Sequence, residues 1–193
     1  MARTPSTMAP LGTPAPPFSL PDPSGRIFTR DALTGPHGLL VVFLCNHCPF
    51  VKHIRQGLAD FARDQEGRGV GIVAISSNDV ERYPADSPEL MAVEAREAGY
   101  TFPYLYDATQ EVALAYGAAC TPDFFLYDGE GRLVYRGQFD GSRPGNDVPV
   151  TGLDLRRAVD ALVEGRELPG QQVPSLGCNI KWKPGNEPEW FGA

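Results

Sequence analysis

The sequence predicts an α/β fold in which a mixed central sheet is flanked by helices. Two apolar runs, Leu39 to Leu44 and Val70 to Ile75, have the length and continuity of strands that are buried on both faces. Segments with helical spacing alternate with these runs, and a hairpin follows between Phe124 and Phe139. The predicted order is therefore β-α-β-α-β-α-β-β-α, which covers a sheet with helices on both sides.

The helices are predicted from capping residues and apolar periodicity. Pro49 suits the first turn of a helix because its missing N–H has no intrahelical partner there. Ser87-Pro88 combines an N-cap with a proline at the first helical position. Thr151, with Asp154 three residues later, predicts a capping box for the last helix. One apolar face identifies the helix after Pro49, and its residues are Phe50, Ile54, Leu58 and Phe61.

Composition limits the classes of protein to which the chain can belong. Its 193 residues suit one domain (1–193), with an N-terminal arm (1–14) and a tail rich in proline and glycine (166–193) that packs on the domain. A net charge of −7 without a basic stripe excludes nucleic acid as a partner. No segment reaches the roughly 18 apolar residues of a membrane span, and no signal-peptide stretch is present. We therefore expect a soluble cytoplasmic protein that has no membrane partner.

The thiols at the end of the first apolar run define the candidate site. In the cytoplasm a C-x-x-C is more often redox-active or metal-binding than a static disulfide. Cys48 directly precedes Pro49, so it lies where free N–H groups and the helix dipole stabilise a thiolate. Cys48 is therefore the expected nucleophile, and Cys45 is its expected disulfide partner. His47 and Lys52 are expected to lower the pKa of the thiol further.

The stretch Cys45-Asn46-His47-Cys48-Pro49-Phe50-Val51-Lys52-His53 resembles the thioredoxin/peroxiredoxin (AhpC-TSA, redoxin) superfamily, in particular a bacterial group of redoxin proteins. The tail segment 177–182 resembles the same group. Thr121-Pro122 matches the superfamily's cis-proline, which faces the reactive cysteine. The resemblance implies a thioredoxin-like fold with extra N-terminal strands. It also implies thiol chemistry that needs an external thiol reductant and no cofactor.

The register of the motif departs from both parent families. In an ungapped alignment Cys48 matches the first cysteine of thioredoxins, while their second cysteine falls on Val51 and their buried acid on Val42. Peroxiredoxins share the Cys-Pro pair, but Cys45 replaces their Thr or Ser and Val41 replaces their proline. The motif is thus half present for each family. Two activities follow from the resemblance: thiol–disulfide exchange, and peroxide reduction through Cys48.

The preferred function is a thiol–disulfide oxidoreductase that acts on a protein or small-molecule disulfide. The close variant is an antioxidant thiol peroxidase, in which Arg136 on a late strand supports the thiolate. Cys178 is either a packing residue of the tail or a third redox thiol. Cys120 is either a small buried residue or a group near the site.

Two hypotheses from other classes stay open. The first is a copper- or zinc-binding chaperone on the same scaffold, because the motif contains thiol and imidazole ligands at Cys45, His47, Cys48 and His53. A second ligand pair at the spacing of a structural zinc site is not visible in the sequence, so the expected site has no metal. The other hypothesis is an interaction module in which the thiols are buried and inert.

Overall fold

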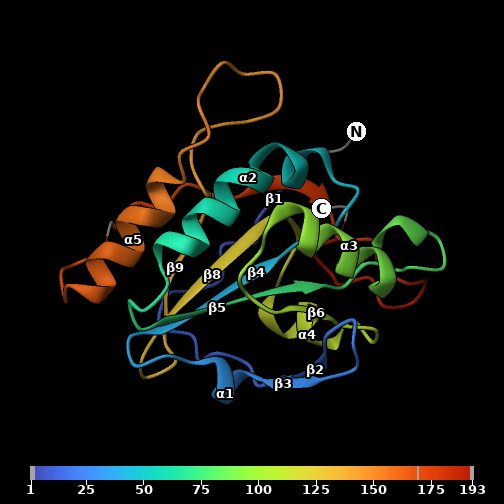
Figure 1. Ribbon diagram of the computed structural model, residues 1–193, viewed down its shortest axis with the longest axis horizontal. Helices are drawn as coiled ribbons and strands as arrows, with labels where there is room; N and C mark the ends of the chain where they lie inside the picture. Colours follow the sequence, from blue (N-terminus) through green and yellow to red (C-terminus); the bar gives the residue numbers. More distant parts are fainter. Residues whose placement is uncertain (1–2, 169, 192–193) are drawn as a thin grey trace.

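The computed structural model describes residues 3–168 and 170–191 (Figure 1). At its centre is a five-stranded mixed sheet with the order β6-β5-β4-β8-β9. The first three of these strands are mutually parallel, and β8 pairs antiparallel with both β4 and β9. The strands of this sheet are β4 (Gly38–Phe43), β5 (Val70–Ser76), β6 (Tyr104–Tyr106), β8 (Asp123–Asp128) and β9 (Leu133–Gly137). The predicted α/β class is confirmed.

Strand β4 is central because both of its faces are apolar. Leu40 and Val42 contribute to a core on one side of the sheet, and Leu39 and Val41 to a second core on the other. Every residue of the strand is buried. The strand begins one residue earlier than predicted, at Gly38, where a Cβ would lie 1.9 Å from the Tyr127 carbonyl oxygen.

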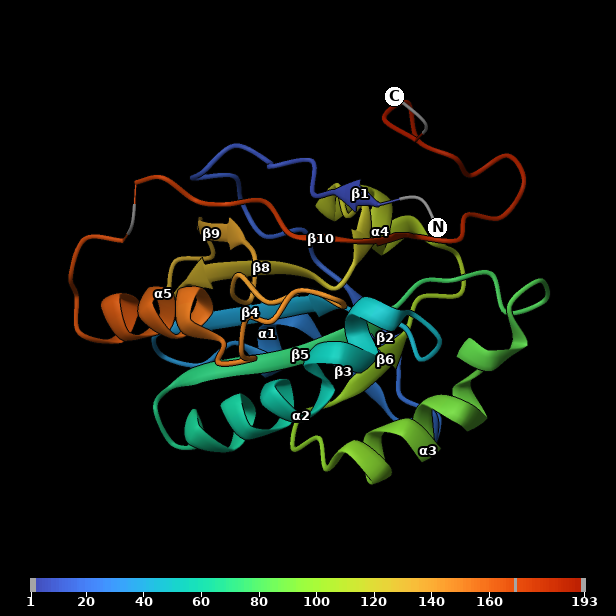
Figure 2. The same ribbon diagram turned by 90° about the horizontal axis from the view of Figure 1, so that it is seen from above.

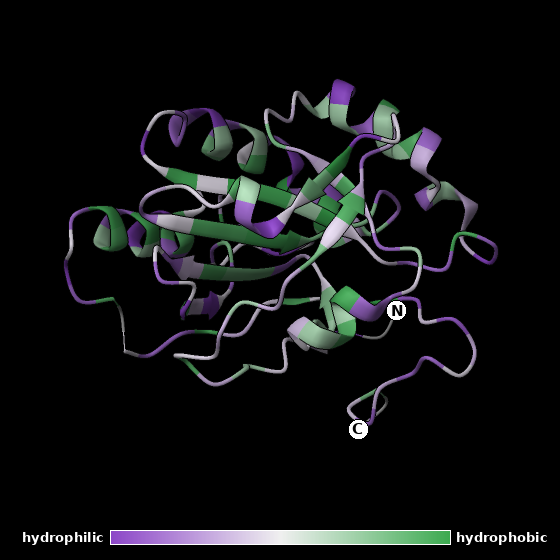
Figure 3. Cartoon of the chain, turned by 90° about the horizontal axis from the view of Figure 1, so that it is seen from below, coloured by the Kyte–Doolittle hydropathy of each residue, from purple (hydrophilic) through white to green (hydrophobic). Residues whose placement is uncertain are grey.

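Helices cover both faces of the sheet. Apolar residues of α2, α3 and α5 share the core that contains Leu40, while α4 packs in the core that contains Leu39. Figure 3 shows apolar colour concentrated on the central strands and polar colour on the outer faces of the helices. Among the described residues, none of the helices has the length and apolar character needed to cross a membrane. The helices are α1 (Arg30–Leu33), α2 (Pro49–Asp64), the 3-10 helix η1 (Pro84–Asp86), α3 (Pro88–Ala98), α4 (Glu111–Tyr116) and α5 (Leu153–Val163).

One of the two predicted caps is correct. Ser87 caps α3, where its side chain accepts a hydrogen bond from the Leu90 amide. The predicted capping box of α5 is wrong, because the N-cap residue is Gly152 and makes no side-chain cap. The Asp140 carboxylate accepts hydrogen bonds from the amides of Thr151 (2.7 Å) and Gly152 (2.6 Å) instead. A distant acid thus replaces the local cap.

The two ends of the chain meet in a small second sheet. Its order is β1-β10-β7, and both pairings are antiparallel. Figure 2 shows the C-terminal segment running beside β1. The strands are β1 (Thr4–Pro5), β7 (Cys120–Thr121) and β10 (Leu176–Asn179), and a separate hairpin is formed by β2 (Ser19–Pro21) and β3 (Ile27–Thr29). The arm and the tail, for which no strands were predicted, therefore each contribute one.

Candidate functional site

The loop that carries the two motif cysteines joins the end of β4 to the start of α2. Cys48 is the N-cap residue of α2 and Pro49 its first residue, as the sequence predicts. The first amides of a helix have no intrahelical acceptor, so they and the dipole favour a negative charge at this position. Cys45 is 1% and Cys48 0% exposed, so solvent does not reach either thiol directly.

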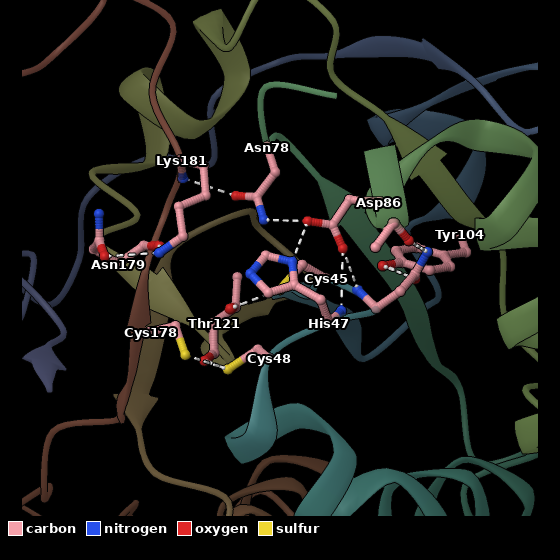
Figure 4. Close-up of polar contacts among 12 residues, drawn as sticks. Cys45, His47, Cys48, Asn78, Asp86, Tyr104, Thr121, Cys178, Asn179 and Lys181 are labelled. Atoms are coloured by element: carbon pink, nitrogen blue, oxygen red, sulfur yellow. Dashed lines mark hydrogen bonds and ion pairs between the residues drawn. The ribbon is translucent and has the colours of Figure 1, made fainter. Parts of the chain in front are cut away.

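Thr121 contacts both thiols. The peptide bond between Thr121 and Pro122 is cis, as the resemblance implied. The Thr121 hydroxyl lies 3.2 Å from the Cys45 sulfur, and the Thr121 carbonyl oxygen lies 3.2 Å from the Cys48 sulfur (Figure 4). Thr121, at the end of β7, therefore holds both motif sulfurs through one hydroxyl and one carbonyl contact.

The third thiol at the site is Cys178 in β10. Its sulfur lies 2.9 Å from the Cys48 sulfur, and Figure 4 shows the two thiols facing each other. Cys178 is 4% exposed. As a thiol, Cys48 can donate to the Thr121 carbonyl group, and as a thiolate it can accept from Cys178. The structure thus brings a third cysteine to the two that the motif contains.

The thiols themselves set the electrostatics. Hydrogen bonding by the Cys178 thiol has the largest effect on Cys48 and holds its pKa well below the ordinary value. The Cys45 thiol and the Val51 amide lower this pKa further. The same hydrogen bonds raise the pKa of Cys178 and of Cys45, and burial raises both further. These shifts favour the negative charge on Cys48 at the helix terminus and protonated thiols at Cys178 and Cys45.

The expected roles of His47 and Lys52 require correction. The His47 ring is bound to Asp86 through Nδ1 at 2.6 Å and stacks on Tyr83 at 5.6 Å. Lys52 is exposed on α2, and it is not among the main influences on the pKa of Cys48. The buried Asp86 carboxylate sets the orientation of the His47 ring. Lys52 lies on the exposed face of α2.

Asp86 organises the loop that precedes Cys48. Its carboxylate is 0% exposed. Oδ1 accepts hydrogen bonds from the backbone amides of Asn46 (2.8 Å) and His47 (3.1 Å). Oδ2 accepts from the His47 ring and from the Asn78 side chain at 2.7 Å. Burial raises the pKa of Asp86, but these hydrogen bonds outweigh it and the net shift is downward. Sequence reasoning missed this residue, because nothing in the polar loop around it signals a buried carboxylate.

The residues that could hold a metal ion differ from those that the sequence suggested. Within the described ranges, 3–168 and 170–191, the group close enough to share an ion is Cys45, His47 and Asp86, whose ligand atoms lie within 4.8 Å of one another. Cys48 and His53, which the sequence suggested, are not in that group. The Asp86 carboxylate already accepts four hydrogen bonds, so an ion would have to displace at least one N–H donor. This geometry favours a role for Asp86 in holding the loop.

Arg136 lies on the wrong face of the sheet to support the thiolate. It pairs with Phe125, which belongs to the core opposite α2. Its guanidinium donates to the Ala9 carbonyl (2.7 Å) and to Gln172 (2.8 Å). The expectation that Arg136 assists Cys48 is therefore corrected by the alternation of side chains along β9.

Cys120 fits the description of a small buried residue. It is 0% exposed, and its sulfur lies 3.6 Å from the Pro122 carbonyl oxygen. Burial raises the pKa of its thiol well above the ordinary value. These features favour a protonated and unreactive thiol.

Comparisons with known proteins agree with this architecture. The profile described as the AhpC/TSA family matches residues 11–136. No match was found among curated proteins. The crystal structure of an uncharacterized conserved protein from Geobacillus kaustophilus is 54% identical, with a TM-score of 0.93, and the match covers 95% of this chain and 98% of that one.

Two further structures extend the comparison. A hypothetical protein from Sinorhizobium meliloti 1021 is 55% identical with a TM-score of 0.93, over 94% of this chain and all (100%) of that one. A thiol:disulfide interchange protein of the thioredoxin family from Chlorobium tepidum TLS is 20% identical with a TM-score of 0.60, over 79% and 97% of the two chains. At that identity the last likeness shows the shared thioredoxin-like fold alone.

Proposed function

The chain belongs to the AhpC/TSA family, and from this premise we propose that it is a thiol–disulfide oxidoreductase with Cys48 as its nucleophile. The observation that carries the proposal is the position of the Cys48 sulfur. It lies at the N-terminus of α2, 2.9 Å from a second thiol. A thiolate attacks a disulfide to form a mixed disulfide, which a neighbouring thiol then resolves. The site supplies both groups, and an external thiol reductant returns the pair to the reduced state.

The test is reduction of a small aromatic disulfide by the full chain in the presence of an external dithiol. We expect Cys48→Ser to lower the rate to that of the dithiol alone. Cys120→Ala is the matched control, because it removes another fully buried thiol whose sulfur contacts a backbone carbonyl near the same turn. Its rate should equal that of the wild type. Full activity in Cys48→Ser would refute the assignment.

Peroxide reduction is the second candidate, and the burial of Cys48 favours it. A sulfur with 0% exposure is more easily reached by a small peroxide than by a protein disulfide. In this reaction the thiolate takes one peroxide oxygen to form a sulfenic acid and releases an alcohol or water. A second thiol then condenses with the sulfenic acid and releases water. Comparing the rates of peroxide consumption and of disulfide reduction for the same wild-type preparation decides between the candidates.

A further inference from the structure

Strand β10 brings the C-terminal segment against the nucleophile. It is the central strand of the second sheet, with β1 on one side and β7 on the other. Its register pairs Cys178 with Thr121 and Asn179 with Cys120. Thr121 contacts the Cys48 sulfur through its carbonyl oxygen, and Cys178, which is paired with Thr121, lies 2.9 Å from the same sulfur. The position of Cys178 is thus fixed by backbone pairing on both edges of its strand.

The close approach of β10 to β7 depends on a glycine. A Cβ at Gly177 would lie 2.0 Å from the Thr121 carbonyl oxygen and 2.6 Å from its carbon. Any larger residue at this position would force the two strands apart. Glycine at position 177 therefore lets the neighbouring Cys178 reach the sulfur of Cys48.

We propose that Cys178 is the resolving thiol of Cys48 and that β10 is the arm that delivers it; this rests on the proposed thiol chemistry of Cys48. The two sulfurs, 2.9 Å apart, need to approach by less than 1 Å to reach the disulfide bond length of about 2.05 Å. The redox disulfide therefore joins α2 to the C-terminal strand instead of closing the C-x-x-C loop.

Cys45 has a different set of contacts. Its sulfur is bound to the Thr121 hydroxyl at 3.2 Å, and the two residues that follow it are tied to Asp86 through their amides. Cys45 is therefore held in place by Thr121 and by the loop bound to Asp86, and it acts as a positioning residue that is not itself oxidised in the cycle.

The reaction balances with these two thiols. The Cys48 thiolate attacks one sulfur of a substrate disulfide, so a bond from Cys48 to that sulfur forms and the other substrate sulfur leaves as a thiolate. Cys178 transfers its proton to this leaving group and attacks the Cys48 sulfur. The Cys48–Cys178 bond forms, and the second substrate sulfur leaves as a thiolate. The substrate gains two electrons, the cysteine pair loses two, and the external thiol later restores them.

The direct test maps the disulfide in the full chain. The reduced protein is treated with one equivalent of diamide, quenched in acid, alkylated, digested and analysed by mass spectrometry. We expect the Cys48–Cys178 pair, with Cys45 and Cys120 alkylated. A Cys45–Cys48 disulfide with alkylated Cys178 overturns the inference but leaves the proposed function intact. No disulfide at Cys48 overturns both.

Variants in which one cysteine is replaced by serine give an independent readout. With a small disulfide as substrate, Cys178→Ser should accumulate a mixed disulfide on Cys48, because serine keeps the size of the side chain but cannot resolve the bond. Cys45→Ser should resolve the mixed disulfide and complete the cycle. The reverse pattern would show that Cys45 is the resolving thiol.

A third test moves the strand without touching a thiol. Gly177→Val should slow formation of the Cys48–Cys178 disulfide by about tenfold or more, because it lowers the effective concentration of Cys178 at the nucleophile. Alkylation of Cys48 should become faster. Gly170→Ala is the control in the same tail, since a Cβ there meets no atom within 4 Å. Unchanged disulfide formation in Gly177→Val would contradict the role of β10.

Discussion

The Asp86 carboxylate offers the sharpest single perturbation of the site. Asp86→Asn keeps the shape of the side chain but replaces one acceptor oxygen with an NH2 group. The remaining oxygen can still accept from the amides of Asn46 and His47. The side-chain donor of Asn78, 2.7 Å away, then faces another donor, and the His47 ring loses a charged partner at 2.6 Å. The substitution therefore leaves the Asn78 donor unpaired and weakens the hydrogen bond to His47, both at a fully buried position.

The expected loss follows from these contacts. A buried donor left without an acceptor costs about 1–3 kcal/mol, and loss of the charge on the bond to His47 adds about 1 kcal/mol. We expect Asp86→Asn to lower the free energy of unfolding by about 2–4 kcal/mol at neutral pH. Because the pKa of Asp86 is lowered in the folded state, its contribution is complete above the unfolded pKa and is lost as the pH falls through the folded pKa. The gap between wild type and variant should therefore narrow in acid.

Urea denaturation at neutral and acidic pH measures both effects. Asp79→Asn is the control, because Asp79 lies in the same loop and is also buried. Its carboxylate accepts a hydrogen bond from the Glu81 amide, and the side-chain oxygen of asparagine can accept the same bond. We expect this control to lose less than about 1 kcal/mol. If Asp86→Asn and Asp79→Asn unfold at the same urea concentration, Asp86 does not hold the loop that precedes Cys48.

Three further predictions concern single groups. Cys178→Ala should raise the pKa of Cys48 by about one to two units, because it removes a hydrogen bond to the thiolate worth about 1.5–3 kcal/mol; thiolate absorbance against pH measures the shift, and an unchanged midpoint would contradict it. Burial raises the pKa of Asp123 from 3.8 to about 7. The free energy of unfolding should therefore fall as the pH rises through this range. Asp123→Asn should therefore be more stable than wild type above that range, by about 4 kcal/mol at most, and equal to it in acid; thermal unfolding across pH tests this, and a constant difference would refute it. Arg136→Met should leave the thiolate titration of Cys48 unchanged, since the guanidinium binds Gln172 on the other face of the sheet; a raised midpoint would restore Arg136 to the site.

Local signals in the sequence were enough to predict much of the fold. The apolar run of β4 required burial on both faces, and Cys48-Pro49 marked the start of α2, because both features depend on neighbouring residues. The Thr121-Pro122 pair was recognised by resemblance, and its peptide bond is cis. The Thr151 cap failed for the opposite reason, since Asp140, eleven residues earlier, supplies the acceptor.

The assembly of the site was decided by tertiary structure. Cys178 is 130 residues from Cys48 in the chain, and only the pairing of β10 with β7 brings the two sulfurs within 2.9 Å. Asp86, 40 residues from Asn46, binds the loop through hydrogen bonds that no spacing rule predicts. By itself the sequence determined that a thiol caps a helix at the end of a buried strand. The tertiary structure decided which groups surround that thiol, because backbone pairing and a buried carboxylate act between residues that are far apart in the chain.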